Sequence, residues 1–459
     1  MSKTISKKSN LHKTTKKFAL SELAKRLRLW RYNLDLYAIR GVKSQYRKGM
    51  RIFWWYGFLI STASAFVNSY VTLYALALGA SSLQIGTLAS TARMLEMLAP
   101  IPGAQWATRR GRRKPVVVIA YGLARVALLG ALLVPIFLKG QAAISVIIVF
   151  FALRAGLASL GTPAWTALAG AITPPERRGR YFSSRKMVMA FASMLFVPLA
   201  GQIIEWFAVP VGYQVVFTIS IIISAIALFI YARIPETPTE VSTKKGEGVR
   251  EFLNALTSNR EFLLFALTVM VWNFAWQFGG PYFSVYQVNV LQTTPRVMGL
   301  LATASALVRV MSQFFWGRVV DRRGARWTRA VCTLMIPVLP FLWLPMTKPW
   351  HAIFVNVPSA FLWAGYQLSN FNLLLELPEA RKQTQGIAAY TTLIGLANIA
   401  GPLAGGQVLD RLGYAWNFSI SGFGRLIGAL LFILALKPFG KKTVSTAETL
   451  SPPDADCQK

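Results

Sequence analysis

The chain has 459 residues, of which 54% are hydrophobic and only 15% are charged, and its formal net charge is +33. Its apolar runs continue for about 20 residues or more, long enough for a helix to cross the roughly 30 Å hydrocarbon core of a bilayer. This excludes an ordinary soluble domain, and the basic surplus indicates membrane topology before it indicates nucleic-acid binding.

The first fifty residues contain no run long enough to span a membrane, and Lys and Arg far outnumber the acids Glu22 and Asp35. Between Phe18 and Tyr37 apolar residues recur at three- and four-residue steps with basic residues between them. The pattern fits an amphipathic helix on an anionic leaflet or a solvated basic tail, with an organelle transit peptide as a weaker third interpretation. No cleavable secretory signal is visible.

Twelve apolar stretches follow. They are predicted at 52–78, 82–106, 115–138, 141–172, 181–206, 212–233, 261–291, 296–320, 328–347, 349–376, 384–409 and 414–436. Every second loop is strongly basic; these loops hold Arg109–Arg110, Arg112–Lys114, Arg177, Arg178, Arg180, Arg185, Lys186, Lys244, Lys245, Arg250, Arg322, Arg323, Arg326, Arg329, Arg381 and Lys382. The positive-inside rule places these loops and both termini in the cytoplasm of a multi-pass protein, which we expect in a cell (inner) membrane.

The longest polar connection divides the spans into two sets of six. The predicted domains are a basic cytoplasmic segment 1–50, a six-helix bundle 51–233, a cytoplasmic linker 234–260, a second bundle 261–438 and a disordered tail 439–459. Cys332 falls inside a span and Cys457 in the tail, so no disulfide is expected. Because His12 and His351 are the only histidines, we expect no metal site, and we expect no cofactor.

The second set of spans repeats the first. Gly86 and Gly111 recur as Gly299 and Gly324 at a constant offset (299 − 86 = 324 − 111 = 213). A parallel duplication of six helices is typical of secondary transporters that bind their substrate between the halves, near the midplane of the membrane. The predicted fold class is therefore an all-α integral membrane protein of twelve transmembrane helices in two pseudo-symmetric bundles.

The loop after the eighth span carries a family signature, Gly317-Arg-Val-Val-Asp321-Arg322-Arg323-Gly324-Ala-Arg326. Over about 51–440 the chain resembles the major facilitator superfamily, whose Gly-x-x-x-Asp-Arg-x-Gly-x-Arg motif this segment matches. The resemblance implies a cytoplasmic gate in which Asp321 pairs with arginine, whereas Thr108 in the first copy offers only a neutral hydrogen bond. The gate residues are Thr108, Arg109, Gly111, Arg112, Gly317, Asp321, Arg322 and Gly324.

Ionisable residues inside spans need a cavity or a partner, because one at the bilayer centre costs about 2.5–3.5 kcal/mol on insertion scales. Arg93, Glu96, Arg154 and Arg309 are such residues, and Glu96 aligns with Arg309 in the repeat (309 − 96 = 213). Glu96 is either the proton-coupling carboxylate or the static partner of Arg93. The resemblance makes Arg125 and Arg425 supporting residues, since their spans are peripheral in the family fold.

A cavity rich in arginine favours a small anionic solute, contacted by Arg93, Arg154 and Arg309, because the planar guanidinium suits carboxylate or phosphate. The seventh span adds a possible binding wall of Trp272, Asn273, Trp276 and Gln277, and Gln367 and Asn370 on the tenth span face it in this hypothesis.

Glycine and proline clusters mark candidate helix breaks. Gly279-Gly280-Pro281 is a candidate external hinge. Gly401-Pro402 begins a Gly-Pro-x-x-Gly-Gly pattern that proton-coupled drug antiporters carry in the fifth helix, where this chain has only Pro198 and its neighbours. The clusters at Pro198 and at Gly401-Pro402 also fit close helix packing, which we favour.

The resemblance predicts a secondary transporter that moves a small solute by alternating access, with proton coupling left open and a monomer in the lipid bilayer. The alternative is a proton-coupled multidrug efflux antiporter for lipophilic compounds. An intramembrane enzyme is disfavoured because no reactive His, Asp or metal cluster is visible, and a channel because the two-half repeat suits alternating access. Nucleic acid is not an expected partner.

Overall fold

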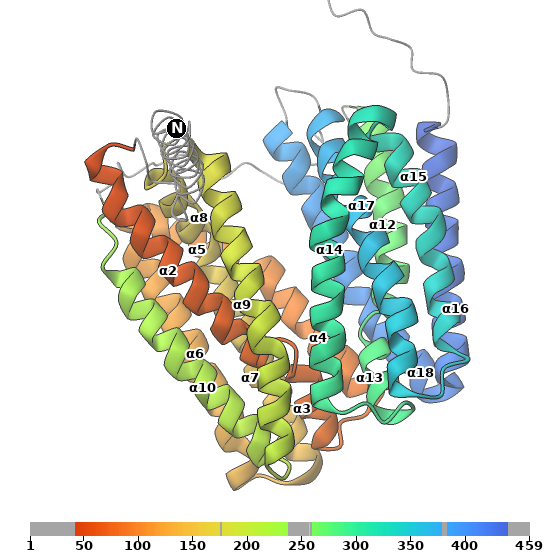
Figure 1. Ribbon diagram of the computed structural model, residues 1–459, viewed down its shortest axis with the longest axis horizontal. Helices are drawn as coiled ribbons and strands as arrows, with labels where there is room; N and C mark the ends of the chain where they lie inside the picture. The colour runs from red at the N-terminus through yellow and green to blue at the C-terminus, as the bar shows by residue number, and fades with distance from the viewer. Residues whose placement is uncertain (1–41, 175–176, 237–256, 258, 379–382, 439–459) are drawn as a thin grey trace, which may run out of the picture.

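The computed structural model describes residues 42–174, 177–236, 257, 259–378 and 383–438, which form two helical bundles side by side (Figure 1). The predicted amphipathic segment, most of the linker, Arg381–Lys382 and the predicted tail lie outside the described residues.

The N-terminal half makes six traverses. Its helices are α2 (Ser44–Val67) with α3 (Val71–Ala77), α4 (Ser82–Leu98) with α5 (Pro100–Arg110), α6 (Lys114–Phe137), α7 (Gly140–Leu160) with α8 (Thr162–Ala171), α9 (Arg178–Trp206) and α10 (Val211–Ala232). The C-terminal half repeats this arrangement with α12 (Arg260–Gly279) and α13 (Tyr282–Asn289), α14 (Pro295–Arg323), α15 (Ala325–Met335) with η2 (Ile336–Val338) and α16 (Leu339–Trp343), η3 (Pro349–Ala352) with α17 (Ile353–Glu376), and α18 (Gln383–Leu436).

Capping residues and glycines mark where several of these helices begin and end. Ser81 and Gln84 form a capping box that begins α4. Gly111 ends α5 with φ 60°, a left-handed conformation that glycine adopts without steric cost. Gly413, with φ 81°, interrupts α18 and separates its two traverses. The twelve-helix, all-α membrane fold predicted from the sequence is therefore confirmed.

The outer surfaces are apolar. In the described chain, eight helical stretches are long and apolar enough to cross a membrane, judged by length and composition. On α14 the exposed side chains Leu307, Met311 and Phe314 form one stripe at helical spacing, as Met94 and Leu98 do on α4. Such stripes face lipid, since exposed large apolar side chains on this scale need an apolar solvent.

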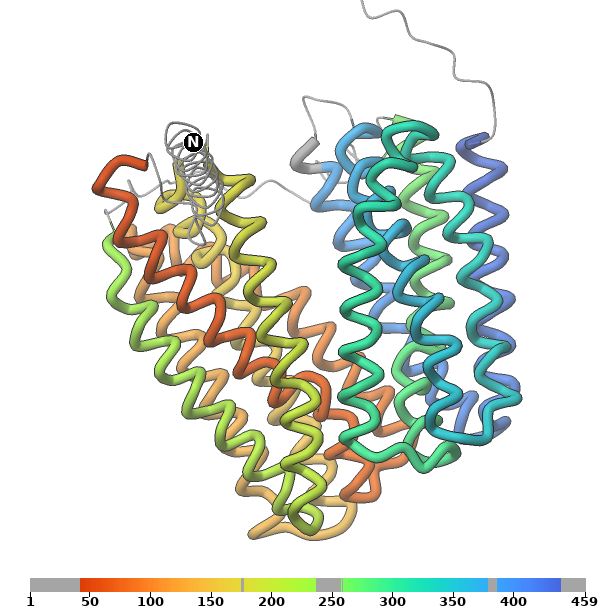
Figure 2. Tube along the Cα trace, in the orientation of Figure 1, coloured from red at the N-terminus to blue at the C-terminus, as the bar shows by residue number. Residues whose placement is uncertain are grey.

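The two halves diverge toward one face of the molecule. In Figures 1 and 2, α2 begins and α18 ends at this face, shown at the top, and α5, α9, α14 and α15 bring the basic loops to it. We call it the basic face and the other the opposite face. Near the opposite face α3, α4 and α13 lie close together, whereas α9 and α14 separate toward the basic face (Figure 2).

Two seams join the halves near the opposite face, and their hydrogen bonds obey the repeat. The backbone N–H of Leu83 donates to Asp410 Oδ2 at 3.1 Å, and that of Arg296 donates to Glu205 Oε1 at 3.0 Å (296 − 83 = 213). Each bond places a carboxylate of one half on the first turn of a helix of the other half, where the helix dipole favours negative charge.

About two turns deeper the same symmetry recurs in hydrogen bonds donated by hydroxyl groups. Ser90 Oγ donates to the carbonyl of Ile399 at 2.7 Å, and Thr303 Oγ1 donates to that of Met194 at 3.1 Å (303 − 90 = 213). The sequence repeat is therefore also a repeat of contacts between the halves.

A glycine and a tyrosine complete each seam. Tyr70 Oη donates to the carbonyl of Val197 at 2.6 Å, and a Cβ added to Gly299 would lie 2.9 Å from both Tyr70 Oη and Pro198 Cα. In the other seam Tyr282 Oη donates to the carbonyl of Pro402, and Gly86 lies against both groups. We call these two contacts the tyrosine–glycine clasps.

Candidate functional site

A cavity of about 580 Å³ lies within the N-terminal half. Its walls come from α2, α4, α6, α7, α8, α9 and α10, so that described residues of a single bundle enclose it. This differs from the expectation of a site shared between the halves. Its size is within the range of small-molecule pockets in proteins.

Arg154 on α7 and Arg125 on α6 line the cavity. Arg154 Nη2 donates to Asn68 Oδ1 at 2.9 Å, and Arg125 Nε donates to Ser224 Oγ at 2.9 Å. Arg125 Nη1 also donates to the carbonyl of Tyr121. The hydrogen-bond partners of both arginines are neutral, and Glu96 is the carboxylate of the cavity lining that lies near enough to act on the charge of Arg154. The expectation that Arg125 is only a supporting residue is wrong, since α6 turns it into the cavity.

Arg185 is a third lining arginine, although its sequence context predicted a residue of a basic loop. It lies on α9, which starts at Arg178, and is 5% exposed. Its Nε donates to the carbonyl of Phe53 at 3.2 Å, and its Cζ lies 4.3 Å from the Phe53 ring centroid and 5.4 Å from that of Trp165. These contacts desolvate the faces of the guanidinium while its charge remains.

Glu96 also lines the cavity and pairs with Arg93 on the same helix, Nη1 to Oε2 at 2.8 Å. The side chains are 54% exposed for Arg93 and 39% for Glu96, which places the cavity mouth on this side of α4. Glu96 lies two residues from each of the lipid-facing Met94 and Leu98, hence on the far side of the helix from lipid. The ion pair between Arg93 and Glu96 is formed in this state. A role of Glu96 in proton coupling stays a prediction.

Arg309 has the matching position on α14, two residues from each of the lipid-facing Leu307 and Met311. It is exposed and makes no hydrogen bond or ion pair with the described residues. It therefore faces the space between the diverging halves, outside the cavity of the N-terminal half.

The predicted wall on α12 is packed inside the C-terminal half. Trp272 is 1% exposed and stacks on Tyr366 with ring centroids 4.5 Å apart, and Trp276 lies 4.6 Å from Trp363. Asn273 Nδ2 donates to the carbonyl of Val269 on its own helix. Gln277 is buried beside Gly401. In this state none of the four lines the cavity.

The two predicted polar residues of α17 differ from each other. Gln367 is exposed. Asn370 Oδ1 accepts hydrogen bonds from Arg329 Nη1 and, at 3.0 Å, from Tyr390 Oη. Arg329 is 1% exposed and stacks on Tyr366, 4.1 Å from its centroid. Asn370 thus accepts a hydrogen bond from Arg329, which is buried although the sequence predicted it in a loop.

The gate residues are not latched. Asp321 is exposed and forms no ion pair within the described chain, and Thr108 Oγ1 donates to the carbonyl of Ala104 on its own helix. Arg109, Arg112 and Arg322 are exposed, and a Cβ on Gly317 would meet nothing within 4 Å. Gly324 turns the chain with φ 86°. An unlatched gate agrees with halves that are apart at the basic face.

Of the candidate helix breaks, some separate two helices and others lie inside a continuous helix. α12 ends at Gly279 and α13 begins at Tyr282, so Gly280 and Pro281 separate two helices. By contrast α9 continues through Pro198 and α18 through Gly401 and Pro402. The structure therefore does not break the helices at these last three residues, and it agrees with the favoured interpretation of close packing: a Cβ on Gly401 would lie 2.9 Å from the carbonyl oxygen of Phe274.

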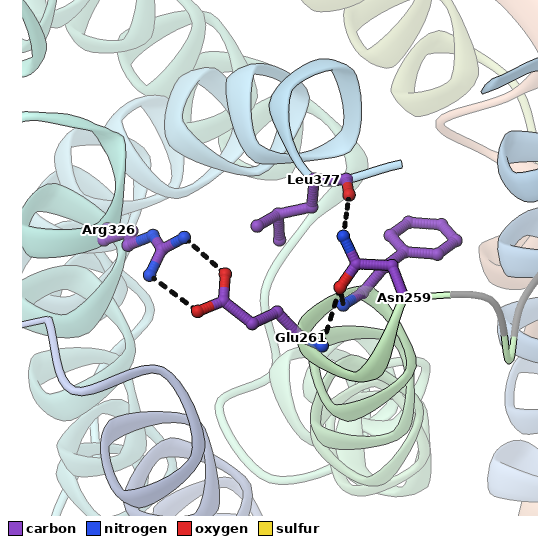
Figure 3. Close-up of polar contacts among 5 residues, drawn as sticks. Asn259, Glu261, Arg326 and Leu377 are labelled. Carbon is purple, nitrogen blue, oxygen red and sulfur yellow. Dashed lines mark hydrogen bonds and ion pairs between the residues drawn. The ribbon is translucent and has the colours of Figure 1, made fainter. Parts of the chain in front are cut away.

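Polar contacts tie the basic end of the C-terminal half together (Figure 3). Asn259 Oδ1 accepts from the N–H groups of Glu261 and Phe262 while its Nδ2 donates to the carbonyl of Leu377 at 2.8 Å. Glu261 Oε2 pairs with Arg326 Nη2 at 2.6 Å, with side chains 52% and 40% exposed.

We expect Asn259→Ala to destabilise the protein more than Arg326→Gln. Asn259 caps α12 and satisfies the end of α17, worth about 1 kcal/mol or more, whereas an exposed ion pair contributes about 0–1 kcal/mol. Urea unfolding in detergent measures both; equal losses would contradict the ranking.

Comparison with known proteins matches this architecture. A profile described as Major Facilitator Superfamily matches residues 53–378 and 280–455. "Multidrug resistance protein 2" of Bacillus subtilis is 24% identical over 355 residues, 75% of this chain and 84% of that protein. A "Putative sugar efflux transporter" of Deinococcus radiodurans is 27% identical over 183 residues, 38% of this chain and 43% of that protein.

Solved structures share the fold at low identity. The nucleoside transporter NupG superposes with a TM-score of 0.65 at 14% identity, covering 85% of this chain and 99% of that one. A bacterial homologue of the human lysosomal transporter Spinster, in an inward-facing and unoccupied conformation, gives 0.65 at 15% identity, covering 87% and 98%. These likenesses concern the fold.

Proposed function

The chain belongs to the Major Facilitator Superfamily, and we propose that it carries a small organic anion through the cavity of its N-terminal half by alternating access. As a member of this family it is a multi-pass membrane transporter of small molecules rather than an enzyme. The anionic substrate, its site in the N-terminal half and the coupling to protons are the parts that we propose.

One observation carries the choice of an anion. Arg125, Arg154 and Arg185 line the cavity from three different helices, and the carboxylate among the described lining residues, Glu96, is already paired with Arg93. The described lining thus carries three guanidinium groups against one carboxylate, and such an excess of charge is costly inside a membrane, so the cavity favours a ligand that supplies negative charge. A guanidinium binds carboxylate or phosphate through two parallel hydrogen bonds.

The basic face is assigned to the cytoplasm by the positive-inside rule, which makes the present state inward-open. We place the protein in the inner membrane as a monomer with cytoplasmic termini. Glu96 at the cavity mouth is the proton-coupling residue of this proposal, exchanging Arg93 for a proton during the cycle.

The second candidate is proton-coupled efflux of lipophilic drugs. The names of two relatives, "Multidrug resistance protein 2" and "Multi-drug resistance efflux pump PmrA homolog", favour it. Tyr56, Tyr121 and Trp165 in the cavity wall suit flat apolar compounds as well.

Thermal stabilisation in detergent distinguishes the two candidates. The purified protein is heated with matched anionic, neutral and cationic solutes, because a ligand that binds the folded state raises the unfolding midpoint. Stabilisation by anions that Arg154→Gln abolishes supports the proposal. Stabilisation by lipophilic cations that Glu96→Gln abolishes favours drug efflux.

We expect Glu96→Gln to remove proton-driven accumulation while solute exchange at equal pH continues. Glutamine keeps the shape and a hydrogen bond toward Arg93 but carries no proton to exchange. Proteoliposomes with and without a pH gradient measure this; Glu261→Gln, which alters an exposed carboxylate outside the cavity and the seams, is the comparison for a general effect of losing an acid. Gradient-driven uptake unchanged in Glu96→Gln would exclude the assignment.

A further inference from the structure

The three arginines of the cavity stand at different depths. Arg185 lies against Gly57 of α2, and Arg154 bonds to Asn68 at the end of the same helix. These two α2 positions are eleven residues apart (68 − 57 = 11), which is about 16 Å along a helix that rises 1.5 Å per residue. Arg125, bonded to Ser224, lies on a third wall of the same cavity.

Arg185 is held in a slot that exposes one edge of its guanidinium. A Cβ on Gly57 would lie 2.6 Å from its Nε, 3.0 Å from its Cζ and 3.1 Å from its Nη2, so the group rests on bare backbone. The rings of Phe53 and Trp165 lie near the guanidinium of Arg185, and its Nε donates a hydrogen bond to the carbonyl of Phe53. The two Nη groups make no hydrogen bond to described residues and are not enclosed, which leaves them facing the cavity.

Arg154 is open in the same way at the other end. One of its nitrogens, Nη2, is bonded to Asn68, and its Nε and Nη1 have no bond to described residues and are not enclosed. The cavity thus offers two separate guanidinium edges, each able to receive one acidic group.

Resting on the proposed anion transport, we infer that the substrate is a two-ended anion, such as an α,ω-dicarboxylate, whose acidic groups occupy the Arg154 and Arg185 ends together. The segment between them passes Arg125 and the aromatic and apolar wall formed by Tyr56, Ile60 and Leu128. A single-headed anion makes charge-assisted hydrogen bonds to only one of the two guanidinium edges, which costs affinity relative to a two-ended anion.

Matched ligand pairs test this. We would measure Kd in detergent for a series of α,ω-dicarboxylates, from succinate to dodecanedioate, and for the half methyl ester of each. The expected result is an optimum length at which the dicarboxylate binds at least about tenfold more tightly than its half ester, since a lost charge-assisted hydrogen bond costs about 1.5–3 kcal/mol.

Variants locate the two ends. Arg154→Gln and Arg185→Gln are each expected to lower the dicarboxylate affinity to that of the half ester. Gly57→Ala, which displaces the Arg185 guanidinium and leaves its charge in place, is expected to do the same. Gly49→Ala is the matched control on α2, because its Cβ would meet Ile172 at an ordinary 3.5 Å.

The outcomes separate the two proposals. Half esters that bind as tightly as dicarboxylates at every length in the unaltered protein would overturn the two-ended substrate and leave anion transport standing. Length-independent binding that survives Gly57→Ala, with Arg185→Gln lowering only stability, would make Arg185 a packing residue. No stabilisation by carboxylates of either kind would overturn the proposed anion transport itself.

Discussion

Arg154→Gln is expected to weaken binding of the proposed anionic substrate by about 10- to 100-fold. The residue presents free guanidinium nitrogens to the cavity, and its one partner, Asn68, is neutral. Loss of a charge-assisted hydrogen bond costs about 1.5–3 kcal/mol, and each 1.4 kcal/mol is tenfold in Kd. Folding should survive, because glutamine removes a charge whose presence in the membrane is itself unfavourable. Isothermal titration of the purified protein measures the change.

Arg309→Gln is the matched control for the loss of one membrane arginine. Arg309 faces the space between the halves and is not among the residues that line the cavity. We expect ligand affinity within about twofold of the unaltered protein. The opposite pattern, with binding lost in Arg309→Gln and kept in Arg154→Gln, would move the site from the N-terminal bundle to the interface between the halves.

The traverses were predictable because each depends on one local property, a run of apolar residues long enough to cross the bilayer. The turns at Gly111 and Gly324 were equally local, since a positive φ favours glycine. The repeat offset identified Ser90 and Thr303 as equivalent positions. It did not identify their partners Ile399 and Met194, because the residue that lies opposite is decided by how the two bundles pack.

The site was harder to predict, because it depends on which side of a helix faces inward. Arg185 follows several basic residues and resembles a loop residue in sequence, yet α9 begins at Arg178 and its second turn is already inside the bundle. Gly57 was the available signal: a glycine in mid-helix suggests that another group approaches the backbone. Trp272 is the opposite case, because it was predicted to line the site but packs inside its own bundle. An aromatic residue deep in a span more often packs than binds a ligand.

The two seams between the halves explain why the opposite face is closed in this structure. Asp410 and Glu205 each place a carboxylate on a helix start of the other half, and the tyrosine–glycine clasps lie directly beneath. Opening the opposite face must break both seams together, because the repeat makes them equivalent. We expect pairing of Asp321 with arginine at the basic face to offset that loss, which would provide the exchange between two closed faces that alternating access requires.

Gly86→Val is accordingly expected to reduce transport by more than tenfold while ligand binding stays within a few-fold. A Cβ at Gly86 would lie 2.6 Å from the carbonyl oxygen of Pro402 and against Tyr282 Oη, so the clasp cannot close around it. The cavity is built from the N-terminal half alone, so it keeps its lining when the seam separates. Transport in proteoliposomes and Kd in detergent, measured on the same preparation, separate the two effects.

Labelling supplies the independent measurement of the seam. Ser90 is 1% exposed in the closed seam, so Ser90→Cys in a background with Cys332→Ser and Cys457→Ser should react slowly with a membrane-impermeant maleimide and faster when Gly86→Val is added. Gly179→Ala is the control, because its Cβ would meet nothing within 4 Å. Slow labelling and normal transport in Gly86→Val would show that the clasp tolerates a side chain. Closure of the opposite face would then depend on the carboxylates at the helix starts rather than on the tyrosine–glycine contacts.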